Sequence, residues 1–115
     1  MTRVAAIDCG TNTIRLLVAD LASGRDGAPA LVPLARENEI VRLGQGVDRT
    51  GVLDPEALER TLTVVDAYAS DCDELGVAPG EAVRRFVATS ATRDARNRED
   101  FVAGVRRLLG IEPEV

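Results

Sequence analysis

The sequence predicts an α/β domain in which helices pack against a mixed sheet. Two short apolar runs joined by a small polar turn open the chain, which is the pattern of a β-hairpin. A long amphipathic segment with a clear helix start follows at residues 54–75. The remaining chain alternates strand, helix and strand, and such units normally join parallel strands by a right-handed crossover.

The opening hairpin is expected over residues 3–10 and 13–21, because the apolar runs fall there and turn residues separate them. A third strand is expected from about Ala30 to Leu43, weakened at its start by prolines that cannot donate a ladder hydrogen bond. Residues 44–53 are predicted to form a loop.

The first helix has the clearest boundaries in the sequence. Asp54 is a suitable N-cap, Pro55 suits the first helical position, and Gly76 suits the position just past the end. The helix should therefore run for about 21 residues. Its apolar stripe is predicted at Leu58, Leu62, Val65, Ala69 and Cys72, widened by Val64, Tyr68 and Leu75.

A fourth strand is predicted at 82–89, followed by a second helix that starts near Arg93 or Asp94 and ends at Gly110. Gly104 inside that helix suggests close packing, since glycine is otherwise unfavourable there. A last strand begins at Ile111, so the predicted order is β-β-β-α-β-α-β. A βαβ dinucleotide-binding fold is disfavoured because the opening glycine turn leads into a strand.

Composition narrows the function. The chain has 115 residues, enough for one domain or part of one, and a net charge of −5 that provides no general attraction to nucleic acid or an anionic membrane. No leader or membrane-length apolar run is predicted. The absence of His and Lys excludes imidazole catalysis and a lysine-based phosphate loop within this chain. Cys9 and Cys72 match no metal spacing, which favours buried thiols in a reducing cytoplasm.

The most informative stretch lies between Asp8 and Arg15. Asp8 ends the first strand, where a carboxylate beside phosphate oxygens would hold Mg²⁺, and Arg15 could bind an anion at the same place. The turn between them offers backbone N–H groups, hydroxyls and an amide, which can form a concave anion site; its residues are Gly10, Thr11, Asn12 and Thr13. The simpler interpretation is a tight turn that Asp8 caps.

A second polar turn, Thr89 to Arg93, follows the fourth strand. If the first and fourth strands run parallel, both turns lie at the same rim, and Thr89, Ser90 and Arg93 face the same anion as the first turn. The alternative is a helix N-cap with a solvated Arg93. A substrate-groove role for Arg42 also stays open.

These motifs resemble the exopolyphosphatase and guanosine pentaphosphate phosphohydrolase (Ppx/GppA) family. DCGTNTIRLLVAD is similar to its first phosphate motif, and VRLGQGV, DPEALERTL and VATSATRDARNREDF follow in the family's order and spacing. The resemblance covers nearly the whole chain. It is more specific than Asp-x-Gly-Thr alone, which sugar kinases and actin-like ATPases share.

The resemblance implies a ribonuclease-H-like (actin-like ATPase) half-domain and hydrolysis of terminal phosphates from polyphosphate or guanosine pentaphosphate, an activity tied to the stringent response. By this resemblance Asp8 and Arg93 are catalytic residues, with Asp8 near Mg²⁺ or another divalent cation. The implied substrate-binding residues are Gly10, Thr11, Asn12, Thr13, Arg15, Thr89 and Ser90. The chemistry would be in-line attack by water on a phosphoanhydride, with a Glu orienting the water.

The family's catalytic Glu and its second motif, Asp-x-Gly-Gly-Gly, fall beyond Val115. Residues 1–115 are therefore expected to form an N-terminal phosphate-binding subdomain that binds phosphate weakly and is inactive alone. The resemblance leaves room for a homodimer of the full-length protein. Two alternatives remain: an ATP-dependent kinase of the same superfamily, or a non-catalytic module that binds polyphosphate or an alarmone.

Overall fold

The sheet has the strand order β3-β2-β1-β4 in a computed structural model that describes residues 2–115, apart from the side chain of Ser90. The first three strands form an antiparallel meander, and the fourth lies parallel to β1. The predicted mixed sheet is confirmed, and the first and fourth strands do run parallel, which is the condition for a shared rim. The strands are β1 (Thr2–Cys9), β2 (Thr13–Ser23), β3 (Pro29–Ile40) and β4 (Arg84–Ala88).

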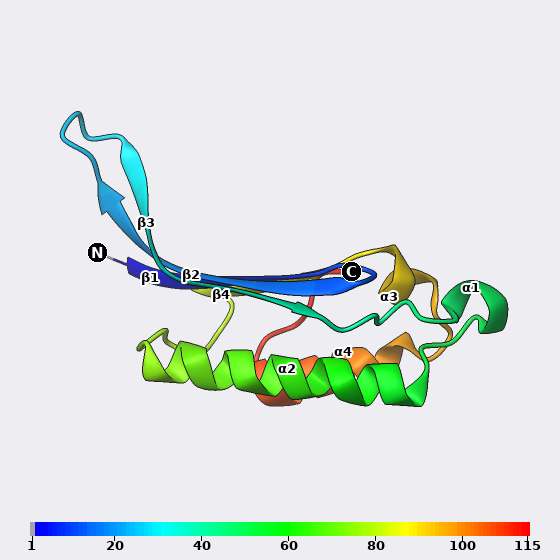
Figure 1. Cartoon of the computed structure of the whole chain (residues 1–115). Helices are drawn as coiled ribbons and strands as arrows, with labels where there is room; N and C mark the ends of the chain where they lie inside the picture. Colours follow the sequence, from blue (N-terminus) through cyan, green and yellow to red (C-terminus); the bar gives the residue numbers. More distant parts are fainter. Residues whose placement is uncertain (1) are drawn as a thin grey trace.

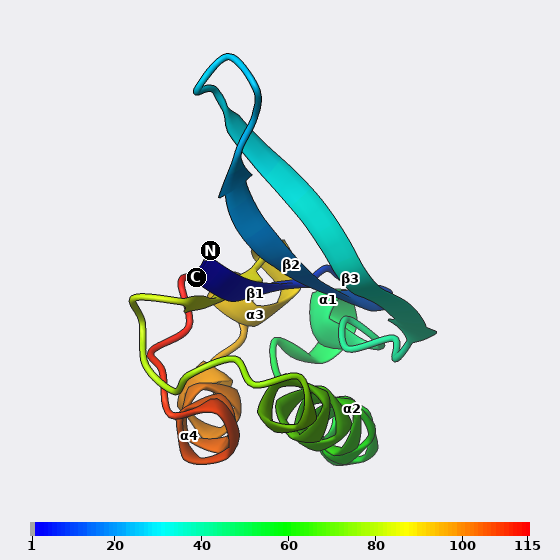
Figure 2. The same cartoon turned by 90° about the vertical axis from the view of Figure 1, so that its left-hand side faces the viewer.

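Two long helices cover one face of the sheet and lie side by side (Figures 1 and 2). The longer helix, α2 (Pro55–Glu74), begins after Asp54, an N-cap residue in the extended conformation that makes no side-chain capping bond. Gly76, with a φ of 75°, lies just past its end. The predicted boundaries of this helix are therefore confirmed. None of the helices in the described part combines the length and apolarity needed to cross a membrane. The helices are α1 (Val47–Thr50), α2 (Pro55–Glu74), α3 (Ser90–Asp94) and α4 (Arg98–Leu109).

Four predicted elements were wrong in detail. The third strand ends at Ile40, and α1 interrupts the expected loop. The second helix was predicted as one, but the structure has two short helices separated at Ala95. Ala95 is extended (ψ 137°) and buried, and the N–H of the next residue, Arg96, donates to Gly51 O. These long-range contacts outweigh the local helical preference. The last strand is present only as a bridge between Val87 and Glu114.

The core lies between the sheet and the helices. Phe86 of β4 packs against Phe101 of α4 with ring centroids 5.8 Å apart. The predicted stripe of α2 is displaced: the side chains buried in the structure are Ala57, Thr61, Val65, Tyr68, Ala69 and Cys72. Leu58 and Leu62 are only partly buried because they line a groove between α2 and α4. A Cβ at Gly104 would lie 2.7 Å from Leu62 Cδ1, so the expected close packing is confirmed.

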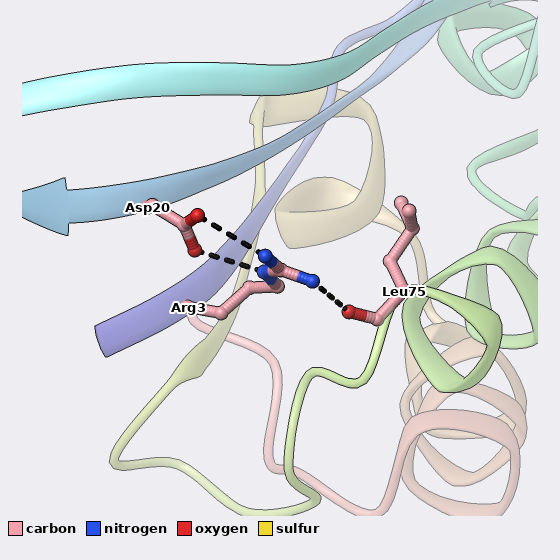
Figure 3. Close-up of polar contacts among 3 residues, drawn as sticks. All are labelled: Arg3, Asp20 and Leu75. Atoms are coloured by element: carbon pink, nitrogen blue, oxygen red, sulfur yellow. Dashed lines mark hydrogen bonds and ion pairs between the residues drawn. The ribbon is translucent and has the colours of Figure 1, made fainter. Parts of the chain in front are cut away.

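Arg3 ties the sheet to the end of α2 (Figure 3). Its Nε and Nη2 donate to both carboxylate oxygens of Asp20 over 2.8 and 3.1 Å, and its Nη1 donates to Leu75 O over 2.7 Å. The β2–β3 pairing has an irregularity between Val18 and Ala19. Past Leu21, the last residue of β2 that pairs with β1, β2 and β3 continue as a two-stranded arm that leaves the body of the molecule (Figure 2).

Candidate functional site

Asp8 and Arg15 lie directly opposite each other on β1 and β2. Both side chains are exposed, whereas their neighbours Ile7, Cys9 and Ile14 are buried. Because successive residues of a strand point to opposite faces, this alternation directs Asp8 and Arg15 to the sheet face away from α2 and α4. A carboxylate and a guanidinium therefore share one open face at the end of the sheet.

That face carries a groove of about 590 Å³, and Asp8 and Arg15 both line it. Arg36 and Asn38 of β3 also line the groove, and Asn38 is the register partner of Arg15. Neither residue was predicted from the sequence as a site residue. Their place depends on the β2–β3 register, which alternation within β3 alone does not determine.

The first polar turn is held partly by its own backbone. Gly10 N donates to Thr13 O over 2.9 Å, so that N–H group is occupied within the turn. The side chains of Thr11 and Asn12 are exposed, and Thr13 is half-buried. The turn thus presents polar side chains to solvent, while the Gly10 amide serves its internal geometry.

The second polar turn lies at the same rim. Thr89 N donates to Cys9 O over 3.2 Å, and Thr89 Oγ1 lies 3.4 Å from the same oxygen. The expected common rim is therefore confirmed. Ser90 begins α3, and its predicted side-chain role lies outside the described part of the structure.

Arg93 lies on α3, where its backbone N–H donates to Thr89 O. Its side chain is exposed, and its Nε lies 3.9 Å from an Asp94 carboxylate oxygen. The structure thus brings Asp8, Arg15 and Thr89 to one rim and places Arg93 one helical turn further along the chain.

The thiol beside this site is not a nucleophile. Burial, reinforced by the charge of Asp8, raises the pKa of Cys9 to about 12, so the unreactive thiol form dominates near neutral pH. Within residues 2–115, no group of three Asp, Glu, Cys or His side chains could hold a metal ion. Asp8 still suits Mg²⁺, which is commonly held by one or two carboxylates while substrate phosphates and waters complete its shell.

The open rim brings an acidic side chain, an arginine and two hydroxyl-bearing turns together at the end of a mixed α/β sheet. The sequence profile of the Ppx/GppA phosphatase family matches residues 17–115. The chain belongs to this family.

Its relatives include exopolyphosphatases. It is 52% identical over 110 residues to exopolyphosphatase 2 of Mycobacterium tuberculosis, covering 96% of this chain and 33% of that protein. It is 35% identical over 101 residues to a bifunctional 3-dehydroquinate synthase/phosphatase of Fusobacterium nucleatum, covering 88% of this chain and 15% of the relative. The chain thus spans at most about a third of these curated relatives.

Solved structures agree with the fold. The Ppx/GppA family member of Aquifex aeolicus superimposes with a TM-score of 0.84 at 35% identity, over 99% of this chain and 34% of that one. An exopolyphosphatase from Cytophaga hutchinsonii gives 0.84 at 29% identity, over 99% of this chain and 34% of its own. The predicted fold class is therefore confirmed.

Proposed function

We propose that this chain supplies the first phosphate-binding part of an enzyme that hydrolyses terminal phosphoanhydride bonds of inorganic polyphosphate. The observation that carries the proposal is the Asp8–Arg15 pair, which shares its rim with the Thr89 turn. Such a rim can bind one oligoanion with the Arg15 guanidinium and the hydroxyl groups of the turns, while the Asp8 carboxylate lies beside them. The 52% identity to a protein named exopolyphosphatase 2 favours polyphosphate over guanosine pentaphosphate.

In this proposal Arg15 and Arg93 bind phosphate oxygens, because a guanidinium matches two phosphate oxygens at once. Arg15 is exposed at the groove, ready for an anion. Arg93 has only a long, exposed contact with Asp94, and such pairs contribute little to stability, so a phosphate can replace it. The turn residues Gly10, Thr11, Asn12 and Thr13, with Thr89 and Ser90, enclose the same anion.

Asp8 would hold Mg²⁺ or another divalent cation at the mouth of the first turn. When bound, that ion would neutralise charge that develops on the phosphate oxygens. The chain's own contribution is to orient the terminal phosphate against Arg15 and to keep the site open from the sheet face. Asp8 lies next to Arg15 across the strands, so the two side chains can bind the cation and the anion together.

The test is phosphate release from polyphosphate with Mg²⁺. It compares this chain with a version extended by the further two thirds that its relatives contain, and with Arg93→Ala in that version. Release by the extended version that is lost in Arg93→Ala supports the proposal, provided that Arg25→Ala, an exposed arginine in the β2–β3 turn, keeps the activity.

Two other results would contradict it. Release from guanosine pentaphosphate alone would reassign the substrate. Consumption of ATP with transfer to an acceptor, without release from polyphosphate, would indicate a kinase of the same fold.

A further inference from the structure

The first polar turn is clamped from outside by the chain segment that follows β3. Val41 N and Arg42 N both donate to Asn12 O, over 2.8 and 2.9 Å, and Gly44 N donates to Thr11 O over 2.9 Å. Three hydrogen bonds from residues 41–44, hereafter the clamp segment, thus hold two successive carbonyls of the turn. The exposed side chains of Thr11 and Asn12 take their positions from this backbone.

The clamp segment has an unfavourable conformation of its own. Arg42 has a φ of 50°, in the left-handed region that a residue with a side chain rarely adopts. Such a conformation persists only where the surrounding structure holds it. Val41 and Leu43, on either side of Arg42, are almost fully buried and anchor it in the core.

The side chain of Arg60, on α2, donates hydrogen bonds to the clamp segment and to the residue that follows it. Arg60 Nε donates to Val41 O over 2.7 Å, and its Nη2 donates to Gln45 Oε1 over 3.2 Å. The guanidinium therefore contacts the first residue of the segment and the residue just past its end. Thr61, the next residue, is fully buried, so the helix that carries Arg60 is fixed in the core.

The same segment also touches the second turn. A Cβ on Gly44 would lie 2.3 Å from Thr11 Cγ2 and 3.3 Å from Ala91 Cβ, so the three residues meet closely. Further along the chain, Leu53 N donates to Asn97 Oδ1, and Arg96 Nη2 donates to Thr50 O. The connection from β3 to α2 therefore contacts both polar turns of the rim.

From these contacts we infer that Arg60 is a positioning residue for phosphate binding: it fixes the clamp segment, and the clamp segment fixes the Gly10–Thr13 turn. Arg60 itself does not contact the phosphate. The inference rests on the proposed function, because it names a residue that prepares the proposed phosphate turn.

The test replaces Arg60 with Met, which keeps an unbranched stem but removes every donor. The matched control is Arg107→Met, an exposed arginine on α4. Amide hydrogen exchange is measured at Val41, Arg42 and Gly44, and polyphosphate binding with Mg²⁺ is measured by calorimetry. Loss of hydrogen bonds from a charged donor should speed exchange at these amides about ten-fold and weaken binding several-fold, without changing the urea midpoint much. Arg60→Lys, which retains a donor for Val41 O, should restore part of both.

Unchanged exchange at the three amides in Arg60→Met would overturn the inference. Faster exchange with unchanged binding would also overturn it, since the turn would then not depend on the clamp segment for its function. If the unmodified chain binds no polyphosphate while exchange still responds to Arg60→Met, the proposed function fails and the clamp remains as a structural feature. The two failures are therefore distinguishable.

Discussion

The backbone N–H of Thr89 donates to the carbonyl of Cys9, 80 residues earlier in the chain. This bond continues the parallel pairing of β1 and β4, in which Cys9 is the partner of Ala88. It places the turn after β1 and the turn after β4 at one rim of the sheet. The candidate phosphate site exists because this rim collects polar residues from two distant stretches of sequence.

Arg15→Ala should weaken polyphosphate binding about ten-fold or more, since a hydrogen bond to a charged group contributes about 1.5–3 kcal/mol. Calorimetric titration at fixed salt measures the change. Arg25→Ala removes the same charge from the β2–β3 turn, away from the groove, and should leave the affinity nearly unchanged. Equal losses in both variants would show that only net charge matters.

Gly44→Ala should destabilise the fold by about 1–3 kcal/mol, the usual cost of overpacking. The new methyl would meet Thr11 Cγ2 at 2.3 Å. Thr11→Ser removes that carbon, so the Gly44→Ala cost should shrink in the Thr11→Ser background. Urea unfolding of the four proteins measures this coupling, and an unchanged cost in the double variant would rule out the proposed clash.

Asp20→Asn should lower stability near neutral pH and flatten the acid side of the stability profile. Hydrogen bonds from Arg3 lower the pKa of Asp20 below its ordinary 3.8. A depressed folded-state pKa contributes stability that is present above the ordinary pKa and is lost as the pH falls through the lower folded value. Asp66→Asn, an exposed change on α2, provides the control in urea unfolding at a series of pH values. Identical acid limbs for Asp20→Asn and the unmodified chain would contradict this linkage.

The free energy of unfolding should decrease as the pH rises from 4.5 to about 7, because the Glu37 carboxyl loses its proton over this range. A hydrogen bond with Asp71, followed by burial and the charges of Asp71 and Glu39, raises the pKa of Glu37 from 4.5 to about 7. A raised folded-state pKa contributes stability that is complete below the ordinary pKa and is lost as the pH rises through the folded value.

Glu37→Gln should therefore remove much of the stability difference between about pH 5 and about pH 8. Urea unfolding at both pH values measures it, and Glu56→Gln at the exposed start of α2 is the control. A Glu37 carboxyl that titrates at its ordinary pKa in an NMR titration would contradict the prediction.

Local sequence signals correctly predicted the helix ends that capping residues determine. The Asp54–Pro55 start and the Gly76 and Gly110 ends were correct because caps depend on a few neighbouring residues. The helix break at Ala95 was missed because its causes, Gly51 O and the Asn97–Leu53 hydrogen bonds, come from residues more than forty positions away.

Some residues of the candidate site could likewise be selected from the sequence, and others only from the structure. Asp8, the Gly10–Thr13 turn and Arg15 form one contiguous motif, and Thr89 to Arg93 form another, so side-chain chemistry and family resemblance could select them from sequence. Arg36 and Asn38 could be identified as groove residues only from the β2–β3 register. Arg60 could be identified as a positioning residue only from its hydrogen bond to Val41 O. Each of these depends on which strands or segments lie next to each other.

The sequence by itself determined where β1, β2, β4, α2 and the two polar turns form, because hydrophobic period, caps and turn residues act over a few positions. Only the tertiary structure decided that the two turns meet at one rim and that a clamp segment holds the first of them. Strand pairing and register arise from contacts between distant residues, and these are fixed when the common core between the sheet, α2 and α4 is buried.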